Sequence, residues 1–256
     1  MTLSTAPRLT TPAAATTLGL WCHAWQAGAS ADAVLDVLAE IGMRAGVRAD
    51  STKAAVRSGL PGPGEPSGAL SDLLPVLRRG GAAQLLTPVA GDVRGLPPGG
   101  DILGPALDSG AVVVLPDVGI GLVPVDGLWR AYECAHPHPA LDMGEATRLV
   151  DAAVADATRL LARAEVASDR GNPREAMRRA TAAHAVAAPP GLGSAATALL
   201  DRATTLAALL DVAAGHDTAA VTGRQTELVN RALAPLHTAV RDARRTVVAT
   251  AADAAL

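Results

Sequence analysis

The sequence predicts an α+β protein, with a small, mostly antiparallel sheet and flanking helices, followed by an alanine-rich antiparallel four-helix bundle. Two observations predict this class. β-branched runs at residues 111–115 and 120–125 stand on either side of a Pro-Asp-Val-Gly turn, a pattern typical of a hairpin. From residue 142 onward, apolar residues recur with the 3.6-residue period of amphipathic helices.

The composition limits how the core can be built. There is no Phe, and all four Trp and Tyr residues lie before residue 133. The C-terminal half therefore buries only small and aliphatic side chains, which suits close helix–helix packing. Arginine supplies nearly all the basic charge and Lys53 is the sole lysine, a usage typical of GC-rich bacterial genomes.

The chain divides into three parts by composition. Residues 1–14 are mostly Thr, Ala and Pro and predict a disordered arm. Residues 15–139 form the predicted α+β part, and residues 140–256 form the predicted helical bundle. The two larger parts either share one core or fold as separate domains.

Local signals place the elements of the α+β part. Ser30 is an expected N-cap for a helix over residues 31–42, and a second helix is expected over residues 69–79. Residues 84–89 predict a strand, and residues 129–134 predict a third strand after the hairpin. Connections this short cannot cross over, so the sheet should be mostly antiparallel.

Four helix starts organise the C-terminal part. Asp142 opens a capping box, the Asn-Pro pair at residues 172–173 supplies an N-cap and a first-turn proline, and Ser194 and Asp217 precede two further helical runs. Pro235 lies inside the fourth run and should kink that helix. Short links between the four runs predict antiparallel neighbours in a bundle.

The sequence contains no motif that names a reaction. Cys134, His136 and His138 form the only dense His/Cys cluster, and their spacing fits no standard zinc pattern. Cys22 lies in an apolar stretch, which predicts a buried and inert thiol. Lys53 follows no Gly-rich loop, which argues against Walker-type phosphate binding. We therefore expect no metal and no cofactor, and no residue is assigned a catalytic role.

Two hypotheses for function remain. The first is a non-enzymatic protein-interaction or regulatory protein, which binds another protein or a second copy through an apolar stripe on the fourth helix with a rim of arginines. In the alternative, that stripe closes the intramolecular bundle. The candidate partner-binding residues are Leu228, Leu236, Val240, Arg241, Arg244 and Arg245.

The second hypothesis is an enzyme or small-ligand-binding protein with a pocket between the sheet and the bundle. Arg94 lies in a Gly-rich loop after a strand, where its guanidinium has the geometry to bind phosphate or carboxylate. The candidate lining residues are Trp21, Trp25, Asp92, Arg94, Trp129 and His136.

Charge and hydropathy bear on partners and location. The net charge is −3, which argues against nucleic acid as a partner. No apolar run reaches the length of a membrane span, and the N-terminus lacks the pattern of a signal peptide. We therefore expect a cytoplasmic protein that does not bind membranes.

Overall fold

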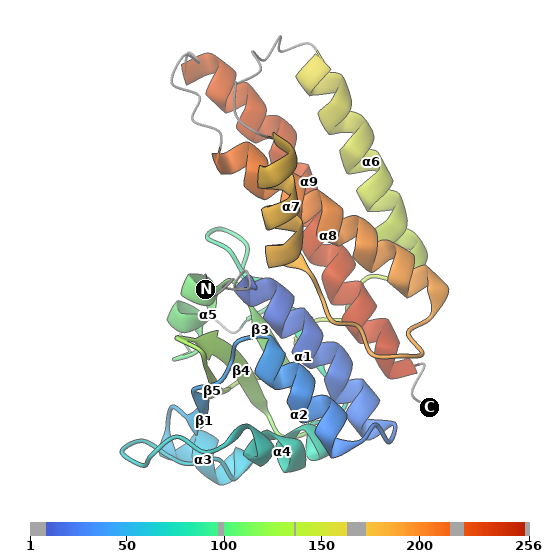
Figure 1. The fold of residues 1–256 in the computed structure, drawn as a ribbon. Helices are drawn as coiled ribbons and strands as arrows, with labels where there is room; N and C mark the ends of the chain where they lie inside the picture. Colours follow the sequence, from blue (N-terminus) through green and yellow to red (C-terminus); the bar gives the residue numbers. More distant parts are fainter. Residues whose placement is uncertain (1–8, 97–99, 136, 163–172, 216–222, 254–256) are drawn as a thin grey trace, which may run out of the picture.

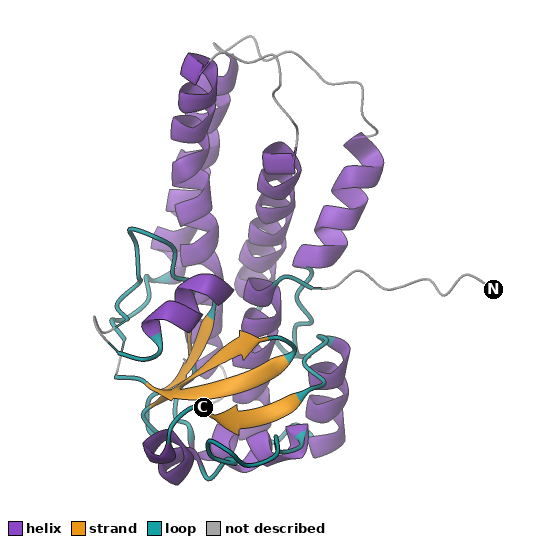
Figure 2. Cartoon of the chain, turned by 90° about the vertical axis from the view of Figure 1, so that its left-hand side faces the viewer, coloured by secondary structure: helices purple, strands orange, loops and turns teal. Residues whose placement is uncertain are grey.

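The protein is represented by a computed structural model, which describes residues 9–96, 100–135, 137–162, 173–215 and 223–253. Within these ranges the chain is a mixed α+β protein, as predicted, with nine α-helices and a single five-stranded sheet. Figures 1 and 2 show the sheet at one end of the molecule and the long helices at the other.

The helices fall into two sets, one around the sheet and one after it in the chain. The first set comprises α1 (Thr11–Gln26), α2 (Ala31–Glu40), α3 (Thr52–Ser58), α4 (Leu73–Arg79) with the 3-10 helix η1 (Leu70–Asp72) before it, and α5 (Leu103–Ser109). The second set comprises α6 (Met143–Ala162), α7 (Pro173–His184), α8 (Ser194–Gly215) and α9 (Gly223–Asp253).

The sheet is built around the predicted hairpin. Its strands are β1 (Gly46–Ala49), β2 (Gln84–Leu86), β3 (Val112–Leu115), β4 (Ile120–Val125) and β5 (Leu128–Glu133), in the spatial order β1-β5-β4-β3-β2. The pairs β2–β3, β3–β4 and β4–β5 are antiparallel, whereas β1 pairs with β5 in parallel. The predicted third strand is β5, and the predicted strand at 84–89 is the shorter β2.

The start of the first helix differs from the prediction. Residues 11–14, expected in a disordered arm, form the first turn of α1, and Ala13 and Ala14 are buried there. Pro12 fits this turn because a proline near a helix start needs no N–H partner. Residues 1–8 of the predicted arm lie outside the described residues.

Helix capping follows the sequence where the signal is local. The Ser30 side chain accepts a hydrogen bond from the Ala33 N–H at the start of α2, as expected. At the start of α6, the Asp142 side chain accepts a hydrogen bond from the Glu145 N–H at 2.8 Å. The start expected at Asp217 lies outside the described residues.

Helix α9 joins the two halves of the molecule. Helices α6 and α8 pack on α9, α7 packs on α8 and touches α1, and α9 continues onto β2 and α1 (Figure 1). One hydrophobic cluster runs from Leu18 and Leu20 on α1 to Val247 and Val248 on α9. The sheet half and the helical half therefore share a continuous core.

A close approach of two backbone segments makes one glycine essential to the sheet. Gly46 begins β1 with a φ of +96°, and a Cβ added there would lie 2.1 Å from the Gly68 carbonyl oxygen. We expect Gly46→Ala to lower the free energy of unfolding by more than about 2 kcal/mol, because left-handed strain and a backbone clash add. Gly64→Ala is the matched control, since Gly64 also has a positive φ (+85°) but no atom within 4 Å of an added Cβ. Equal losses in denaturant titrations of the two variants would contradict the close approach.

Candidate functional site

Of the three tryptophans expected to line a pocket, Trp21 and Trp129 are buried in the core, and Trp25 is partly buried against it. The indole N–H of Trp21 donates to the Ala187 carbonyl at 2.8 Å, and that of Trp25 donates to the Leu74 carbonyl at 2.9 Å. Trp129 on β5 is fully buried. The Trp21 and Trp25 side chains join α1 to the segment after α7 and to α4. None of the three tryptophans lines a concave site described below.

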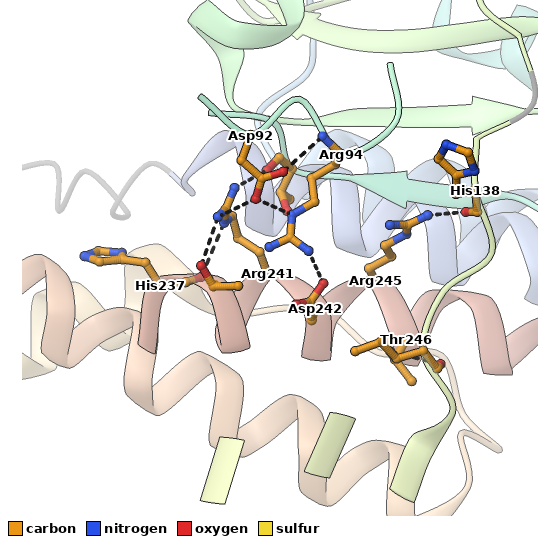
Figure 3. A network of polar contacts seen from close by, with 11 residues as sticks. Asp92, Arg94, His138, His237, Arg241, Asp242, Arg245 and Thr246 are labelled. Atoms are coloured by element: carbon orange, nitrogen blue, oxygen red, sulfur yellow. Dashed lines mark hydrogen bonds and ion pairs between the residues drawn. The ribbon is translucent and has the colours of Figure 1, made fainter. Parts of the chain in front are cut away.

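Two other sets of predicted residues do come together, although the sequence separates them widely. The loop after β2 faces α9, and Figure 3 shows their charged side chains meeting. Arg94 pairs with Asp242, and its Nε lies 2.9 Å from Asp92 Oδ2 without an aligned hydrogen bond. Arg241 donates to Asp92 Oδ2 at 3.0 Å and to the Thr87 carbonyl at 3.3 Å. We call Asp92, Arg94, Arg241 and Asp242 the loop–helix clamp.

The two other candidate arginines of α9, Arg244 and Arg245, also bind the protein's own chain. Arg245 donates to the His138 carbonyl (Figure 3), and Arg244, only 3% exposed, donates to the His184 carbonyl at 3.2 Å. Burial lowers the pKa of Arg244 to about 10 and also lowers the pKa of Arg245. These arginines therefore do not form the free rim that the sequence suggested.

The apolar stripe of α9 is likewise covered from within. Leu236 and Val240 are buried and belong to the common core, where α9 packs against α6 and α8. Leu228 lies on the same helix, but its side chain falls outside the described part. The alternative interpretation of the stripe, that it closes the chain on itself, holds for Leu236 and Val240.

His184 lies at the C-terminal end of α7 among charged groups. Burial and the nearby Arg244 lower its pKa below the ordinary value of 6.5, and Asp211, 3.8 Å away, opposes that shift. Its Nδ1 lies 3.4 Å from the Thr10 hydroxyl. The unfolded chain binds a proton at this histidine more readily than the folded chain does. The contribution of His184 to folding stability is therefore complete above pH 6.5 and declines as the pH falls through the folded-state pKa.

We expect His184→Gln to make that decline shallower, since glutamine has no proton to gain. Thermal unfolding midpoints across a pH series measure the effect, with His138→Gln as a control at an exposed histidine. A residual decline is expected from His237, whose pKa is lowered by burial and by Arg241. Identical pH profiles for the wild type and His184→Gln would refute this account of the α7 end.

The two cysteines are poorly placed for nucleophilic chemistry. Both are buried, and burial raises the pKa of Cys22 to about 12 and that of Cys134 to about 11. Since the thiolate is the reactive form, neither side chain is activated at neutral pH. His136, a candidate of both the metal and the ligand hypotheses, lies outside the described residues.

Among the residues that the structure describes, no group of three His, Cys, Asp or Glu side chains is arranged to hold a metal ion. In the same ranges, no helix has both the length and the apolar character needed to cross a bilayer.

The concave sites on the described surface include the following three. A small pocket of about 220 Å³ in the sheet half is lined by Asp50, Asp101 and Glu133, among others. A groove of about 520 Å³ runs between α6 and α9, with Leu149 and Pro235 in its walls. A larger groove of about 750 Å³ lies between α7 and α8.

The α7–α8 groove is the most apolar of the three. Its lining residues include Met177 on α7 and Leu209 and Val212 on α8, which we call its floor, and Arg174 and Arg178, which we call its walls. Leu209 is a large apolar residue of α8, and it is nevertheless 49% exposed. Leu209 therefore leaves apolar surface exposed in this groove.

The sequence signal for this groove is the spread of leucines around α8, and helical periodicity alone does not assign these leucines to separate contacts. Leu199, Leu200 and Leu210 face the core, whereas Leu209 points away from it. Leucines on more than one face of α8 indicate more apolar surface than one internal contact uses.

Comparison with known proteins places the chain in a family. Residues 15–143 match the description "Rv1486c-like protein, N-terminal domain", and residues 144–245 match "Rv1486c-like protein, C-terminal domain". Two relatives from Mycobacterium tuberculosis are similar over nearly their whole length: uncharacterized protein MT1533 of strain CDC 1551 / Oshkosh and uncharacterized protein Rv1486c of strain ATCC 25618 / H37Rv. Each is 29% identical over 273 residues, which span 90% of this chain and 94% of the relative. No solved structure gives a significant match. Because the two domain matches together run from residue 15 to residue 245, the chain belongs to the Rv1486c-like protein family.

Proposed function

We propose that this protein is a non-enzymatic interaction or regulatory protein, and that α6–α9 act as a helical bundle that presents the α7–α8 groove to another polypeptide. The observation that carries the proposal is the groove itself. Its floor is apolar and open, whereas the stripe on α9 is taken up by the chain's own packing. The proposed interaction surface therefore lies on α7 and α8, the second and third helices of the bundle, and not on α9, the fourth.

The chemistry of the groove supports a polypeptide as its occupant. Met177 has a flexible, polarisable side chain that adapts to different apolar surfaces. The groove lies between two neighbouring helices, and such a groove accepts a third amphipathic helix whose apolar face lies along it.

Catalysis has less support from the charged and nucleophilic side chains. The thiols are buried with raised pKa values, and Lys53 is paired with Glu133 at 2.5 Å on the surface. The small-ligand hypothesis is weakened in the same way, since Arg94 is paired with Asp242 and two of the candidate tryptophans, Trp21 and Trp129, lie in the core.

The proposal predicts a complex that depends on the groove. At native abundance in the cell extract, the wild-type protein should elute from a sizing column well above its monomer mass of 25.7 kDa. Leu209→Asp should elute at the monomer mass, because a carboxylate on the groove floor excludes an apolar partner. Val56→Asp is the control, since Val56 is 80% exposed and lies on α3 in the other half. A wild type that elutes as a monomer, or a Leu209→Asp protein that stays in the complex, would contradict the proposal.

A further inference from the structure

We propose that the partner segment that binds the α7–α8 groove is an acidic amphipathic helix, with an apolar stripe and carboxylates spaced one helical turn apart. This inference rests on the proposed function and names the chemistry of its partner. Three features of the groove carry it: the charge of its walls, the spacing of its floor residues, and the poor fit of a second copy of this chain.

The charged side chains among the described lining residues of the groove are two arginines. Arg174 and Arg178 line it, and no carboxylate is among the lining residues that the structure describes. Within the described residues, Arg174 has no ion pair. Opposite charges across an interface raise the association rate and select against wrong partners, so this surface favours an acidic segment.

Arg178 keeps donors for a partner even though it is already paired. Its Nη2 and Nε donate to Glu175 at 2.7 and 3.0 Å, and its side chain is 76% exposed. A guanidinium has five N–H donors, so this pair leaves several of them to bind a second carboxylate. Glu175 also holds the side chain in place, which lowers the entropy lost on binding.

The spacing of the groove residues matches a helix. Arg174 and Arg178 are four positions apart on α7, so they project from successive turns along one edge of the groove. Met177 and Thr181 follow the same interval, and Leu209 and Val212 are three positions apart on α8. A third helix lying along this groove would place apolar residues on the floor and carboxylates at i and i+4 beside the arginines.

A second copy of this chain fits the groove less well. In a two-fold dimer the same patch contacts itself, so the arginines of both copies would lie in one interface. Like charges brought together in this way oppose association. The acidic helix of a different protein meets no such repulsion.

Designed peptides test the charge preference on the full-length protein. The probe is a labelled amphipathic helix of about 15 residues with a leucine stripe and glutamates flanking it, and the comparison peptide has lysine at every glutamate position. Fluorescence anisotropy at low salt should show the acidic peptide binding at least about tenfold more tightly than the basic one. This preference should shrink in about 1 M salt, where the Debye length is near 3 Å.

Charge reversal in the protein should reverse the preference. The double variant Arg174→Glu with Arg178→Glu should bind the acidic peptide about tenfold or more weakly than the wild type does, and should bind the basic peptide more tightly. Arg159→Glu on α6 is the matched control, because Arg159 is 71% exposed and also pairs with a carboxylate three positions earlier. That control should leave both affinities unchanged.

The outcomes separate this inference from the proposed function. Equal binding of both peptides, lost in Leu209→Asp, would overturn the acidic partner and leave the groove as a polypeptide site. Binding of neither peptide would overturn the acidic helix, and a monomeric wild type in the cell extract would overturn the proposed function as well. A concentration-dependent dimer in sedimentation equilibrium that Leu209→Asp abolishes would show that a second copy is the occupant and would also overturn the inference.

Discussion

Replacing Asp242 with alanine should lower the free energy of unfolding by about 3 kcal/mol or more. The side chains of Asp242 and Arg94 are only 12% and 11% exposed, so the variant leaves a buried guanidinium without its nearest carboxylate. Asp92 does not replace it, because Asp92 is 42% exposed and is shared with Arg241. Denaturant titration followed by circular dichroism measures the loss.

A second variant separates the loss of charge balance from the loss of packing. Arg94→Leu combined with Asp242→Leu removes both charges and keeps apolar volume, so it should recover most of the stability lost in Asp242→Ala. If Asp242→Ala costs less than about 1 kcal/mol, the clamp contributes no more than an exposed ion pair would. The loop after β2 would then not be held to α9 by these charges.

Trp129→Ala should be similarly damaging, with an expected loss of about 3–5 kcal/mol. Trp129 is fully buried on β5 within the core that both halves share. Removing its indole ring opens a large cavity between the sheet and the helices. Thermal and denaturant unfolding of the variant give the loss directly.

Trp129→Phe distinguishes a core residue from a ligand-binding one. The Trp129 Nε1 has no hydrogen-bond partner within the described residues, so phenylalanine removes an unsatisfied donor and retains much of the ring. It should therefore lose much less stability than alanine does. Wild-type stability in Trp129→Ala would show instead that this side chain faces an open pocket.

The elements with local sequence signals were the ones predicted well. The hairpin of β3 and β4 is formed by β-branched runs around a short turn, so its pairing is encoded within 14 residues of chain, from Val112 to Val125. The start of α2 at Ser30 is equally local. By contrast, β1 is only four residues long and is held by parallel pairing with β5, far along the chain, so no local pattern announces it.

The candidate residues show the same limit. Local sequence marks Asp92, Arg94 and Arg241 individually, but the contacts between the loop and α9 span about 150 positions, with 149 between Asp92 and Arg241. Periodicity marked the α9 stripe as buried but could not say that α6 and α8 cover it. It also could not show that α7 leaves Leu209 on α8 uncovered, because that exposure depends on how the helices pack.

Site-specific photo-crosslinking from the groove tests the central claim most directly. A photoreactive amino acid replaces Leu209 in one variant of the full-length protein, which is expressed in the cell. In a second variant, the control, the same amino acid replaces the exposed Val56. We expect position 209 to form a discrete adduct with another polypeptide, attached within an acidic helical segment that mass spectrometry identifies, and position 56 to form none. Absence of an adduct at position 209, or adducts only within the same chain, would contradict the assignment of the α7–α8 groove as an interaction surface.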